Sequence, residues 1–600
     1  MMNGLNTFIA QWSFPLWQTL GTAFLLLAAF FGTGKAVLRF FTKENFTSFA
    51  AGCALFMMFF ALLPSKRGVL LAATLPFALW GIREFLPLLK GNWGKVLFLF
   101  LLFLAFLGSA LLPPYAWDEQ TYQLALPLRH LQSGSFAPVP DNPYSFYPPL
   151  TNWFFANLIT LGGVELPRII VGSVTPLLLL AVWRMTVRFG KVTAAAAVAA
   201  LLFSPLFLNM NRAVYVENFI ALFTVGGVIG AWHLRKKGFA APMVCGLLAG
   251  AAFAVKPTGA VGGVLLFILF FSVKEWKKCL CFCGTAFLFA FFWYLRTFLE
   301  TGNFFYPYAL APLPGSVEHF HKLLGSARYG LEGVPGALLN WLFAGFDRKL
   351  FDGITTGFHI PALGAAAFAG ALLARKSHPS FSPLIIRGLL AFMVPLFLWS
   401  ILFPQSRFVL PLLPFAAASG VIVIKRSPWS KAGFLISGIL LAGTIIFQSS
   451  GPLRHYFVSW RILEQVRKAP GCAMGSLTRD PGLYKSFETL AVSTPPGAKT
   501  LLLMERRGLY CPRPYAIACP GFEPSLTPVP ETPEKLFEKL RSFDYIIVGN
   551  TTQDVDLQSA NASECEKVFI HLKELLEKGK LKRVPCDGYP VLQVVKEERV

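Results

Sequence analysis

The chain has 600 residues, of which 55% are hydrophobic and only 14% charged, with a mean hydropathy of +0.56. A soluble globular protein has a lower apolar content and about a quarter of its residues charged, and this composition also excludes disordered, collagen-like and disulfide-rich chains. The apolar runs are continuous, whereas the lipid-facing strands of a β-barrel alternate between apolar and polar residues. The sequence therefore predicts a polytopic α-helical membrane protein.

The net charge of +23 lies almost entirely in the apolar part of the chain. Residues 453–600 contain 21 Lys and Arg against 18 Asp and Glu, which leaves an excess of 20 positive charges in the first 452 residues. There the basic residues form short clusters between apolar runs, as the cytoplasmic loops of membrane proteins do. We therefore predict that the charge orients the chain in a lipid bilayer, and we expect no nucleic-acid partner.

Apolar runs long enough to cross a bilayer recur throughout the first 452 residues. A span needs about 20 apolar residues. On that basis we predict about fourteen transmembrane helices, near residues 14–32, 46–63, 69–88, 96–113, 168–188, 193–211, 216–234, 240–256, 257–273, 279–296, 358–374, 383–403, 409–424 and 431–449. The first three form an N-terminal region, 1–95, and the others a core, 96–452. No basic segment precedes the first run and no cleavage site follows it, so we expect it to remain as a span.

The basic clusters predict which side each loop occupies. Both termini, the loops 114–167 and 297–357, and the tail 453–600 are expected outside the cytoplasm, and Lys66 and Arg67 are the exception to the rule. The strongest clusters all fall on the opposite, cytoplasmic side: Lys35/Arg39/Lys43, Arg184/Arg188/Lys191, Arg235/Lys236/Lys237, Lys274/Lys277/Lys278, Arg375/Lys376 and Lys425/Arg426/Lys431.

The tail is predicted to be a small extracytoplasmic α/β domain. Strand-like runs occur at 501–504, 545–548 and 591–595, and helix-like runs at 534–540 and 567–576. Cysteines in an oxidising compartment commonly form disulfides. Five cysteines lie in the tail, and we predict that Cys511 and Cys519 are the first choice for a disulfide among them.

Four cations are expected at outer ends of spans, against the charge rule. Residues 238–273 form an apolar stretch too long for one span, so the chain must turn at 256–259 and place Lys256 outside. Arg212, Arg296 and Arg407 fall at other outer ends. Each one alone is explained by a long side chain that reaches the interface. Together they favour an anionic ligand, and the phosphate of a lipid is the natural candidate.

The loop after the fourth predicted span carries the outer acids. If a helix starts at Asp118, then Tyr122 and Arg129 share its face, while Glu119 points about 100° away. The alternative is that Asp118 only caps that helix and that Glu119 only favours its first turn. Glu217, five residues after Arg212, is expected to pair with that arginine.

In this order, these residues resemble the GT-C membrane glycosyltransferases, in the branch of the protein O-mannosyltransferases and the lipid A aminoarabinose transferase. The resemblance covers about residues 96–449. The motifs that carry it are Trp117-Asp118-Glu119 with Tyr122, Pro148-Pro149-Leu150 with Trp153, Arg212 with Glu217, Lys256-Pro257-Thr258-Gly259, Trp293-Tyr294-Leu295-Arg296 with Gly302-Asn303 and Tyr306-Pro307, and Ser406-Arg407-Phe408 before Pro411-Leu412-Leu413-Pro414.

The resemblance implies that a sugar moves, with inversion, from a polyprenyl phosphate (undecaprenyl or dolichyl) to a glycan, lipid or protein acceptor. It makes the chain a hexosyl- or pentosyltransferase of the bacterial inner membrane. Its implied catalytic residues are Asp118, as general base, and Glu119. The other implied site residues are Lys256, Arg296, Arg407 and Arg212 for the donor phosphate, and Tyr122, Asp141, Tyr147, Trp153, Glu217 and Asn303 for the substrates.

Two features of the sequence bear on the acceptor and on a metal. Tyr147 stands directly before the Pro-Pro pair, where the branch often has a basic residue, so the acceptor is left open. The first outer loop has no clear Asp-x-Asp pair, so no cofactor is required, although Asp118 and Glu119 leave a divalent metal possible.

Three other functions remain as alternatives. An O-antigen ligase or polymerase that uses a polyprenyl diphosphate also needs outer cations, but it does not explain the acidic first loop. A secondary transporter predicts ionisable residues near the bilayer midplane rather than at outer ends. In a non-catalytic membrane scaffold, Asp118 would be dispensable.

Overall fold

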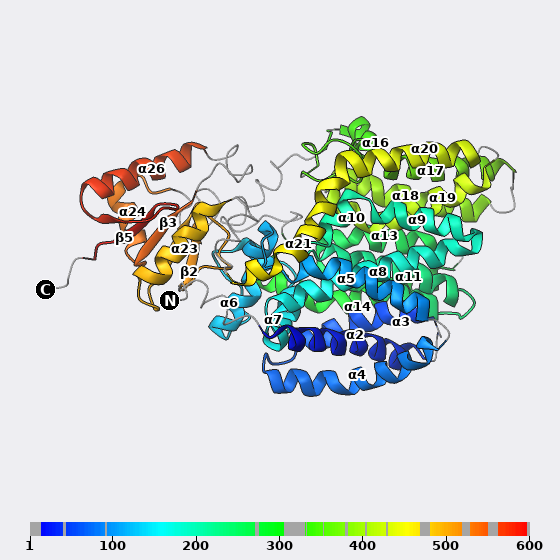
Figure 1. Cartoon of the computed structure of the whole chain (residues 1–600), viewed down its shortest axis with the longest axis horizontal. Coiled ribbons are helices and arrows are strands. Elements are labelled where there is room, and N and C mark those ends of the chain that lie inside the picture. Colours follow the sequence, from blue (N-terminus) through cyan, green and yellow to red (C-terminus); the bar gives the residue numbers. More distant parts are fainter. Residues whose placement is uncertain are drawn as a thin grey trace.

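The apolar runs fold as helices because a bilayer offers no partners for backbone N–H and C=O groups, which must be satisfied within each segment. The computed structural model describes residues 14–39, 42, 44–90, 93–270, 275–304, 306, 330–331, 333–351, 353–377, 382–402, 405–427, 430–468, 480–518, 529–549 and 562–596. In these residues a long helical bundle carries a smaller α/β domain at one end (Figure 1).

Most of the chain belongs to the helical bundle. Six helices of the described part are long and apolar enough to cross a membrane, and seven shorter apolar helices accompany them. The chain is therefore an integral membrane protein, and the number of about fourteen spans stays a prediction. In chain order the helices are α2 (Leu16–Leu38), α3 (Asn45–Ala61), α4 (Arg67–Leu89), α5 (Trp93–Ala110), α6 (Ala125–Ser133), α7 (Leu150–Gly162), α8 (Glu165–Thr186), α9 (Lys191–Leu202), α10 (Pro205–Met210), α11 (Glu217–Leu234), α12 (Ala240–Val255), α13 (Ala260–Phe270), α14 (Trp276–Thr301), α16 (Gly333–Phe343), α17 (His359–Ser377), α18 (Ser382–Leu402), α19 (Leu413–Arg426), α20 (Ser430–Thr444) and α21 (Ser450–Lys468).

Two predicted spans have different limits in the structure. The span expected at 193–211 is broken between α9 and α10, because Ser204 has an extended backbone (ψ 125°) before Pro205. The span expected at 431–449 continues, because a π-helical turn at Ile445–Ser449 joins α20 to α21. The domain boundary predicted at residue 453 therefore falls inside a helix. The predicted loop 114–167 also contains α7, a buried helix of 13 residues that no span-length pattern indicates.

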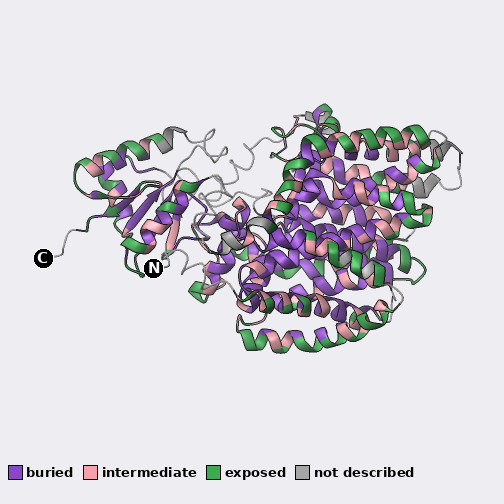
Figure 2. Cartoon of the chain, in the orientation of Figure 1, coloured by how far each residue is buried: buried purple, intermediate pink, exposed green. Residues whose placement is uncertain are grey.

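Small residues let the first helices of the bundle touch. A Cβ atom on Gly34 of α2 would lie 1.6 Å from the carbonyl oxygen of Ser48, and one on Gly52 of α3 would lie 1.8 Å from that of Phe30. Close backbone contact of this kind is a common way for membrane helices to associate. Figure 2 shows the bundle interior buried, whereas α4 and α20 at its edges expose much of their surface.

Basic residues from three of the predicted cytoplasmic clusters meet at one end of the bundle. The guanidinium groups of Arg188 and Arg235 lie 5.1 and 4.1 Å from the ring centre of Trp232. Arg426 lies 4.9 Å from the ring of Phe189. The prediction that these clusters share one side is therefore consistent with the structure. We call the opposite end, where the chain leaves α5, the outer end.

The α/β domain is built on a five-stranded sheet. Its strands are β1 (Thr500–Leu503), β2 (Tyr515–Ala518), β3 (Tyr545–Val548), β4 (Leu581–Val584) and β5 (Val591–Val594), in the order β2-β1-β3-β5-β4. Strands β2, β1 and β3 are parallel, with Thr500 of β1 opposite Tyr515 and Tyr545, and β5 pairs antiparallel with both β3 and β4. The helices of the domain are α23 (Pro481–Ser493), α24 (Pro533–Leu540) and α26 (Ala562–Glu577).

The predicted strands and helices of the tail coincide with β1, β3, β5, α24 and α26. The patterns do not predict α23, β4 or β2, and β2 is only four residues long and half-buried at its first two positions. Cys511 carries a free, buried thiol. Cys519 lies outside the described residues, so the disulfide between these two stays a prediction.

The α/β domain docks on the loop that follows α5. The backbone N–H of Leu509 donates to the carbonyl of Gln120 at 3.2 Å, and the Tyr510 hydroxyl donates to the carbonyl of Pro114 at 2.9 Å. The side-chain amide of Gln120 also donates to the Tyr484 hydroxyl at 2.6 Å. The domain therefore lies on the same side of the bundle as this loop.

A second contact joins the same loop to the edge of the sheet. Arg129 forms a two-pronged ion pair with Asp141, at 2.9 and 3.0 Å. Asp141 Oδ2 accepts from the backbone N–H of Ile517 at 2.6 Å, and Arg129 donates to the carbonyl of Tyr515 at 3.2 Å. Because β2 is an edge strand, these two side chains satisfy polar groups that a sheet edge leaves unpaired.

Candidate active site

Asp118 lies at the outer end of the bundle, directly before a π-helical turn, Glu119–Gln123. Its side chain makes no capping hydrogen bond to this turn, so the cap hypothesis is wrong. Instead, Asp118 Oδ2 accepts from Nη1 of Arg407 and from the hydroxyl of Tyr122, each at 2.6 Å. Tyr122 reaches the carboxylate because residues four apart share a helical face. Arg407 comes from a 3-10 helix, Ser406–Leu412, 289 residues further along the chain.

The two oxygens of Asp118 have different surroundings. Both hydrogen bonds end on Oδ2, and Oδ1 accepts none from any residue that the structure describes. The side chain is 10% exposed. One oxygen is thus held in place while the other is available to a ligand.

An aromatic surface extends from Tyr122. Its ring stacks on Tyr144, with ring centres 4.3 Å apart and planes at 16°. Tyr144 in turn contacts Trp117 and Tyr147 edge-on, at 6.4 and 5.6 Å. Burial, followed by the Asp118 carboxylate, raises the pKa of the Tyr122 hydroxyl well above its usual value. Tyr122 therefore remains a proton donor to Asp118 at neutral pH.

Lys256 lies where α12 ends, because Pro257 cannot continue a helix and favours an extended residue before it (Lys256 φ −164°, ψ 145°). Its Nζ donates to Glu217 Oε1 at 2.9 Å. Nζ lies 4.6 Å from the ring centre of Phe408, and the Arg407 guanidinium lies 5.2 Å from the same ring. Lys256 and Arg407 therefore lie beside the same ring, and they are two of the four cations for which the sequence predicts a shared anionic ligand.

The expected pairing of Glu217 with Arg212 is wrong, since Glu217 binds Lys256 instead. Its second oxygen, Oε2, and the hydroxyl of Thr258 are both buried without a hydrogen-bond partner among the described residues. Buried polar atoms without partners are uncommon and need an explanation. A polar ligand at this place would supply one.

Glu119 lies behind Asp118 and is fully buried. Its Oε2 accepts from the backbone N–H groups of Tyr115 and Ala116, each at 3.0 Å, and Oε1 accepts from that of Val214 at 2.9 Å. Arg168 forms an ion pair with Oε1, at 2.9 Å. Both oxygens are therefore occupied by the protein, which favours a structural part for Glu119 and leaves its predicted catalytic part without geometric support.

Arg296 and Arg212 do not share the partners of Lys256 and Arg407. Arg296 donates to the carbonyls of Ser145 and Phe136, at 3.1 and 3.2 Å, and so ties the outer loop to α14. The charge of Arg212 acts on the pKa of Tyr115, and the Arg212 carbonyl accepts from Arg168 at 2.6 Å. Of the four predicted phosphate ligands, the geometry thus brings only Lys256 and Arg407 together.

Some of the remaining predicted substrate residues lie beside the aromatic surface, and others are used in contacts within the protein. Tyr147 lies in the aromatic surface, 5.8 Å from Tyr306. Trp153 contacts Trp293 at 5.7 Å, and its buried Nε1 has no partner among the described residues. Asp141 is used in the contact with β2. Asn303 is buried just beyond the end of α14, where its carbonyl accepts from the Thr301 hydroxyl.

Comparisons with known proteins give a family match for part of the chain and a similar fold for most of it. The family model for dolichyl-phosphate-mannose-protein mannosyltransferase matches residues 147–295. The crystal structure of ArnT from Cupriavidus metallidurans bound to undecaprenyl phosphate is similar, with a TM-score of 0.51 and 14% identity, over 84% of this chain and 99% of ArnT. The chain therefore has the fold of ArnT. The crystal structure of ArnT from the same organism in the apo state gives a TM-score of 0.51 and 13% identity, over 84% of this chain and 98% of ArnT. No curated protein matches significantly.

The GT-C motifs did not reveal every residue that shapes this site. Arg168, which is buried and holds Glu119, begins a predicted span, where an arginine commonly reaches the interface. Tyr144 lies between motifs and carries no pattern of its own. Phe408 follows Arg407 in a quoted motif, but its position between two cations depends on the fold.

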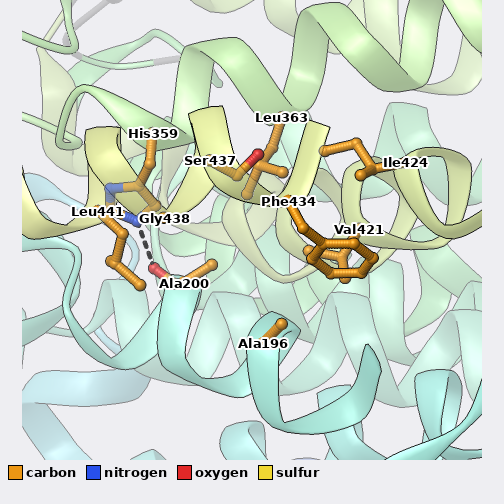
Figure 3. A pocket seen from close by; sticks show the side chains of 10 residues that line it. All are labelled: Ala196, Ala200, His359, Leu363, Val421, Ile424, Phe434, Ser437, Gly438 and Leu441. Carbon is orange, nitrogen blue, oxygen red and sulfur yellow. Dashed lines mark hydrogen bonds between the residues drawn. The ribbon is translucent and has the colours of Figure 1, made fainter. Parts of the chain in front are cut away.

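Two further observations concern metal binding and a cavity in the helical bundle. The described residues contain no group of three or more His, Cys, Asp and Glu side chains that could hold a metal ion. A cavity of about 100 Å³ is lined mainly by apolar residues from α9, α17, α19 and α20 (Figure 3). Its one imidazole, His359, donates from Nε2 to the carbonyl of Ala200 at 2.6 Å and lies 3.0 Å from the Thr444 hydroxyl. This ring is engaged by the protein and offers no evident chemistry.

Proposed function

We propose that this protein transfers a sugar from a polyprenyl phosphate to an acceptor hydroxyl at the extracytoplasmic face of the membrane, with inversion at the sugar carbon. The fold supports the donor class, because ArnT, which shares it, has been crystallised with undecaprenyl phosphate. The observation that carries the proposal is the carboxylate of Asp118. Arg407 and Tyr122 anchor Oδ2, while Oδ1 is open to a substrate.

In this reaction Asp118 acts as the general base. The acceptor oxygen forms a bond to the anomeric carbon of the sugar, and the bond from that carbon to the phosphate oxygen breaks. The hydroxyl proton passes to Oδ1 of Asp118, and the polyprenyl phosphate leaves with the electron pair. A positioned carboxylate within hydrogen-bond reach of a hydroxyl is suited to this transfer. Attack from the face opposite the phosphate inverts the carbon.

Lys256 and Arg407 bind the donor phosphate. Each is now paired with a carboxylate, so the cluster already tolerates two cations in a largely buried place. Sugar transfer leaves an additional negative charge on the phosphate. Cations held beside that oxygen stabilise the charge as it develops. The guanidinium fork of Arg407 also fits two phosphate oxygens, which a single ammonium group does not.

Glu217 and Thr258 contact the donor close to its phosphate. The unpartnered Oε2 of Glu217 is an acceptor for a sugar hydroxyl, and the Thr258 hydroxyl is a donor for a phosphate or sugar oxygen. Tyr122, Tyr147 and Trp153 provide apolar faces on which a sugar ring can lie. Several hydroxyl contacts of this kind are enough to distinguish one sugar from another.

The reaction takes place at the outer end of the bundle, on the side of the α/β domain. The charge distribution supports an extracytoplasmic position for this end and for residues 453–600, in a bacterial inner membrane. The acceptor is a glycan, lipid or protein with a hydroxyl or comparable nucleophile.

The direct test is a transfer assay with the purified full-length protein. Undecaprenyl-phosphate-linked hexoses and pentoses are offered with candidate acceptors, and NMR gives the anomeric configuration of the product. We expect release of undecaprenyl phosphate and a product of opposite configuration to the donor. Retention of configuration would contradict the mechanism. Activity with diphosphate-linked donors alone would instead favour an O-antigen ligase or polymerase.

A further inference from the structure

The parallel strands of the C-terminal domain point their carboxyl ends toward the active site. Because β2, β1 and β3 are parallel, their carboxyl ends lie together. In open α/β sheets, ligands bind beyond the carboxyl ends of such strands. In this protein, residues 504–510 follow the carboxyl end of β1, and we call them the β1 loop.

The β1 loop lies against the turn that carries Asp118. The backbone N–H of Leu509 donates to the carbonyl of Gln120, two residues from Asp118, and the Tyr510 hydroxyl reaches the carbonyl of Pro114. Both loop residues are buried. The C-terminal domain thus places its strand ends beside the catalytic carboxylate rather than in solvent.

The backbone of the β1 loop is held by an ion-pair network inside the domain. Met504 adopts a left-handed conformation (φ 57°), which is rare for residues other than glycine and redirects the chain after β1. Arg507 then binds Glu505 at 2.6 Å and Asp480 at 2.5 Å. Tyr589 adds a hydrogen bond to Asp480 at 2.8 Å. Arg507 is therefore a structural residue, and the loop that it fixes carries a second arginine, Arg506.

Arg506 is buried in the β1 loop, three residues before Leu509, and its charge acts on the pKa of Tyr306 at the border of the aromatic surface. Burial raises the pKa of Tyr306, and the charge of Arg506 acts in the opposite direction. The Tyr306 hydroxyl donates to the carbonyl of Pro143 at 3.0 Å, and its ring contacts Tyr147 at 5.8 Å. Tyr147 and Tyr144 connect this border to the ring of Tyr122 and hence to the catalytic carboxylate.

We propose that Arg506 binds an anionic group of the acceptor, a phosphate or a carboxylate, so that the C-terminal domain forms one wall of the acceptor site. The proposal rests on the function proposed above. The acceptor hydroxyl would lie at Asp118 and its anionic group at Arg506, with the tyrosine rings between them. A guanidinium group suits this task because its planar fork pairs with two oxygens of phosphate or carboxylate. Donor and acceptor anions are then bound by different cations.

The test uses full-length protein in lipid nanodiscs. Undecaprenyl phosphate is bound first, so that the donor cations are occupied, and glucose 6-phosphate or glucose is then titrated by ligand-observed NMR. We expect Arg506→Gln to weaken glucose 6-phosphate binding by about tenfold or more and to leave glucose binding unchanged, since a hydrogen bond to a charged group is lost. Arg506→Lys keeps the charge and should retain much of the affinity.

Arg541→Gln is the matched control, because Arg541 is an exposed arginine of the same domain at the end of α24. It should bind both sugars as the wild type does. Equal glucose 6-phosphate affinities of Arg506→Gln and the wild type would overturn the assignment, as would an equal loss in Arg541→Gln. Failure of the wild type to bind undecaprenyl phosphate would instead overturn the proposed function, so the two failures are distinguishable.

Discussion

In the proposed mechanism Arg407 contacts both the donor phosphate and Asp118, and its substitution tests that part of the mechanism. In Arg407→Ala the phosphate loses a charge-assisted contact, and such contacts contribute about 1.5–3 kcal/mol. This corresponds to about a 10- to 150-fold loss of affinity. Because Arg407 also donates to Asp118 and Gln405, only some of its N–H groups are left for the phosphate, and we expect the lower part of this range.

The assay is equilibrium binding of undecaprenyl phosphate to purified protein. Arg296→Ala serves as the control, because Arg296 binds the carbonyls of the outer loop and should leave donor affinity within about threefold. Arg407→Lys should lie between the wild type and Arg407→Ala, since it keeps the charge but loses the fork. Thermal unfolding must be checked, because Arg407→Ala also leaves Asp118 without its cation. Wild-type affinity in Arg407→Ala, or an equal loss in Arg296→Ala, would refute the assignment.

Three other predictions concern the support of the site. Glu119→Gln should lower the free energy of unfolding by about 3–5 kcal/mol, measured by thermal unfolding, because the buried Arg168 loses its charge partner; an unchanged unfolding temperature would contradict this. Asp141→Asn should weaken the ion pair with Arg129 and speed proteolysis of the C-terminal domain, whereas equal cleavage rates would show that the pair does not hold the domain. Burial lowers the pKa of His130 to about 4, so its contribution to stability is present above about pH 6.5 and lost as the pH falls toward 4; His130→Asn should flatten that dependence, and an unchanged pH profile would exclude His130 as its source.

The outer charges were predictable because each stands out against apolar sequence, whereas their partners were not. Lys256 is exceptional in its apolar stretch, and Pro257 marks the turn that places it at the outer end. The partner of Lys256 is Glu217, 39 residues earlier in the chain. The sequence paired Glu217 with Arg212 instead, because only five residues separate these two, and that pairing is wrong. Sequence spacing correctly related Asp118 to Tyr122, because both belong to one local turn.

The different parts played by the two neighbouring carboxylates depend on tertiary structure. Asp118 and Glu119 are equivalent in a linear sequence, but the π-helical turn directs one toward Arg407 and the other toward Arg168. Docking of the C-terminal domain was also beyond prediction, since the contact between Asp141 and Ile517 joins segments 376 residues apart. Residues at such separations meet only when the whole chain has folded.

The central claim is that Asp118 is the general base, and sugar transfer by Asp118→Asn tests it most directly. Asparagine keeps the size of the side chain and an oxygen that can accept from Arg407 or Tyr122, but it cannot take a proton from the acceptor. Asp347→Asn is the control, because among the described residues the Asp347 carboxylate accepts hydrogen bonds from the backbone N–H groups of Lys349 and Leu350 alone, which an asparagine oxygen can also do. With undecaprenyl phosphate binding confirmed for both variants, we expect transfer by Asp118→Asn to fall by about 100-fold or more, and Asp347→Asn to retain the parent rate. Transfer at the parent rate by Asp118→Asn would remove Asp118 from the mechanism.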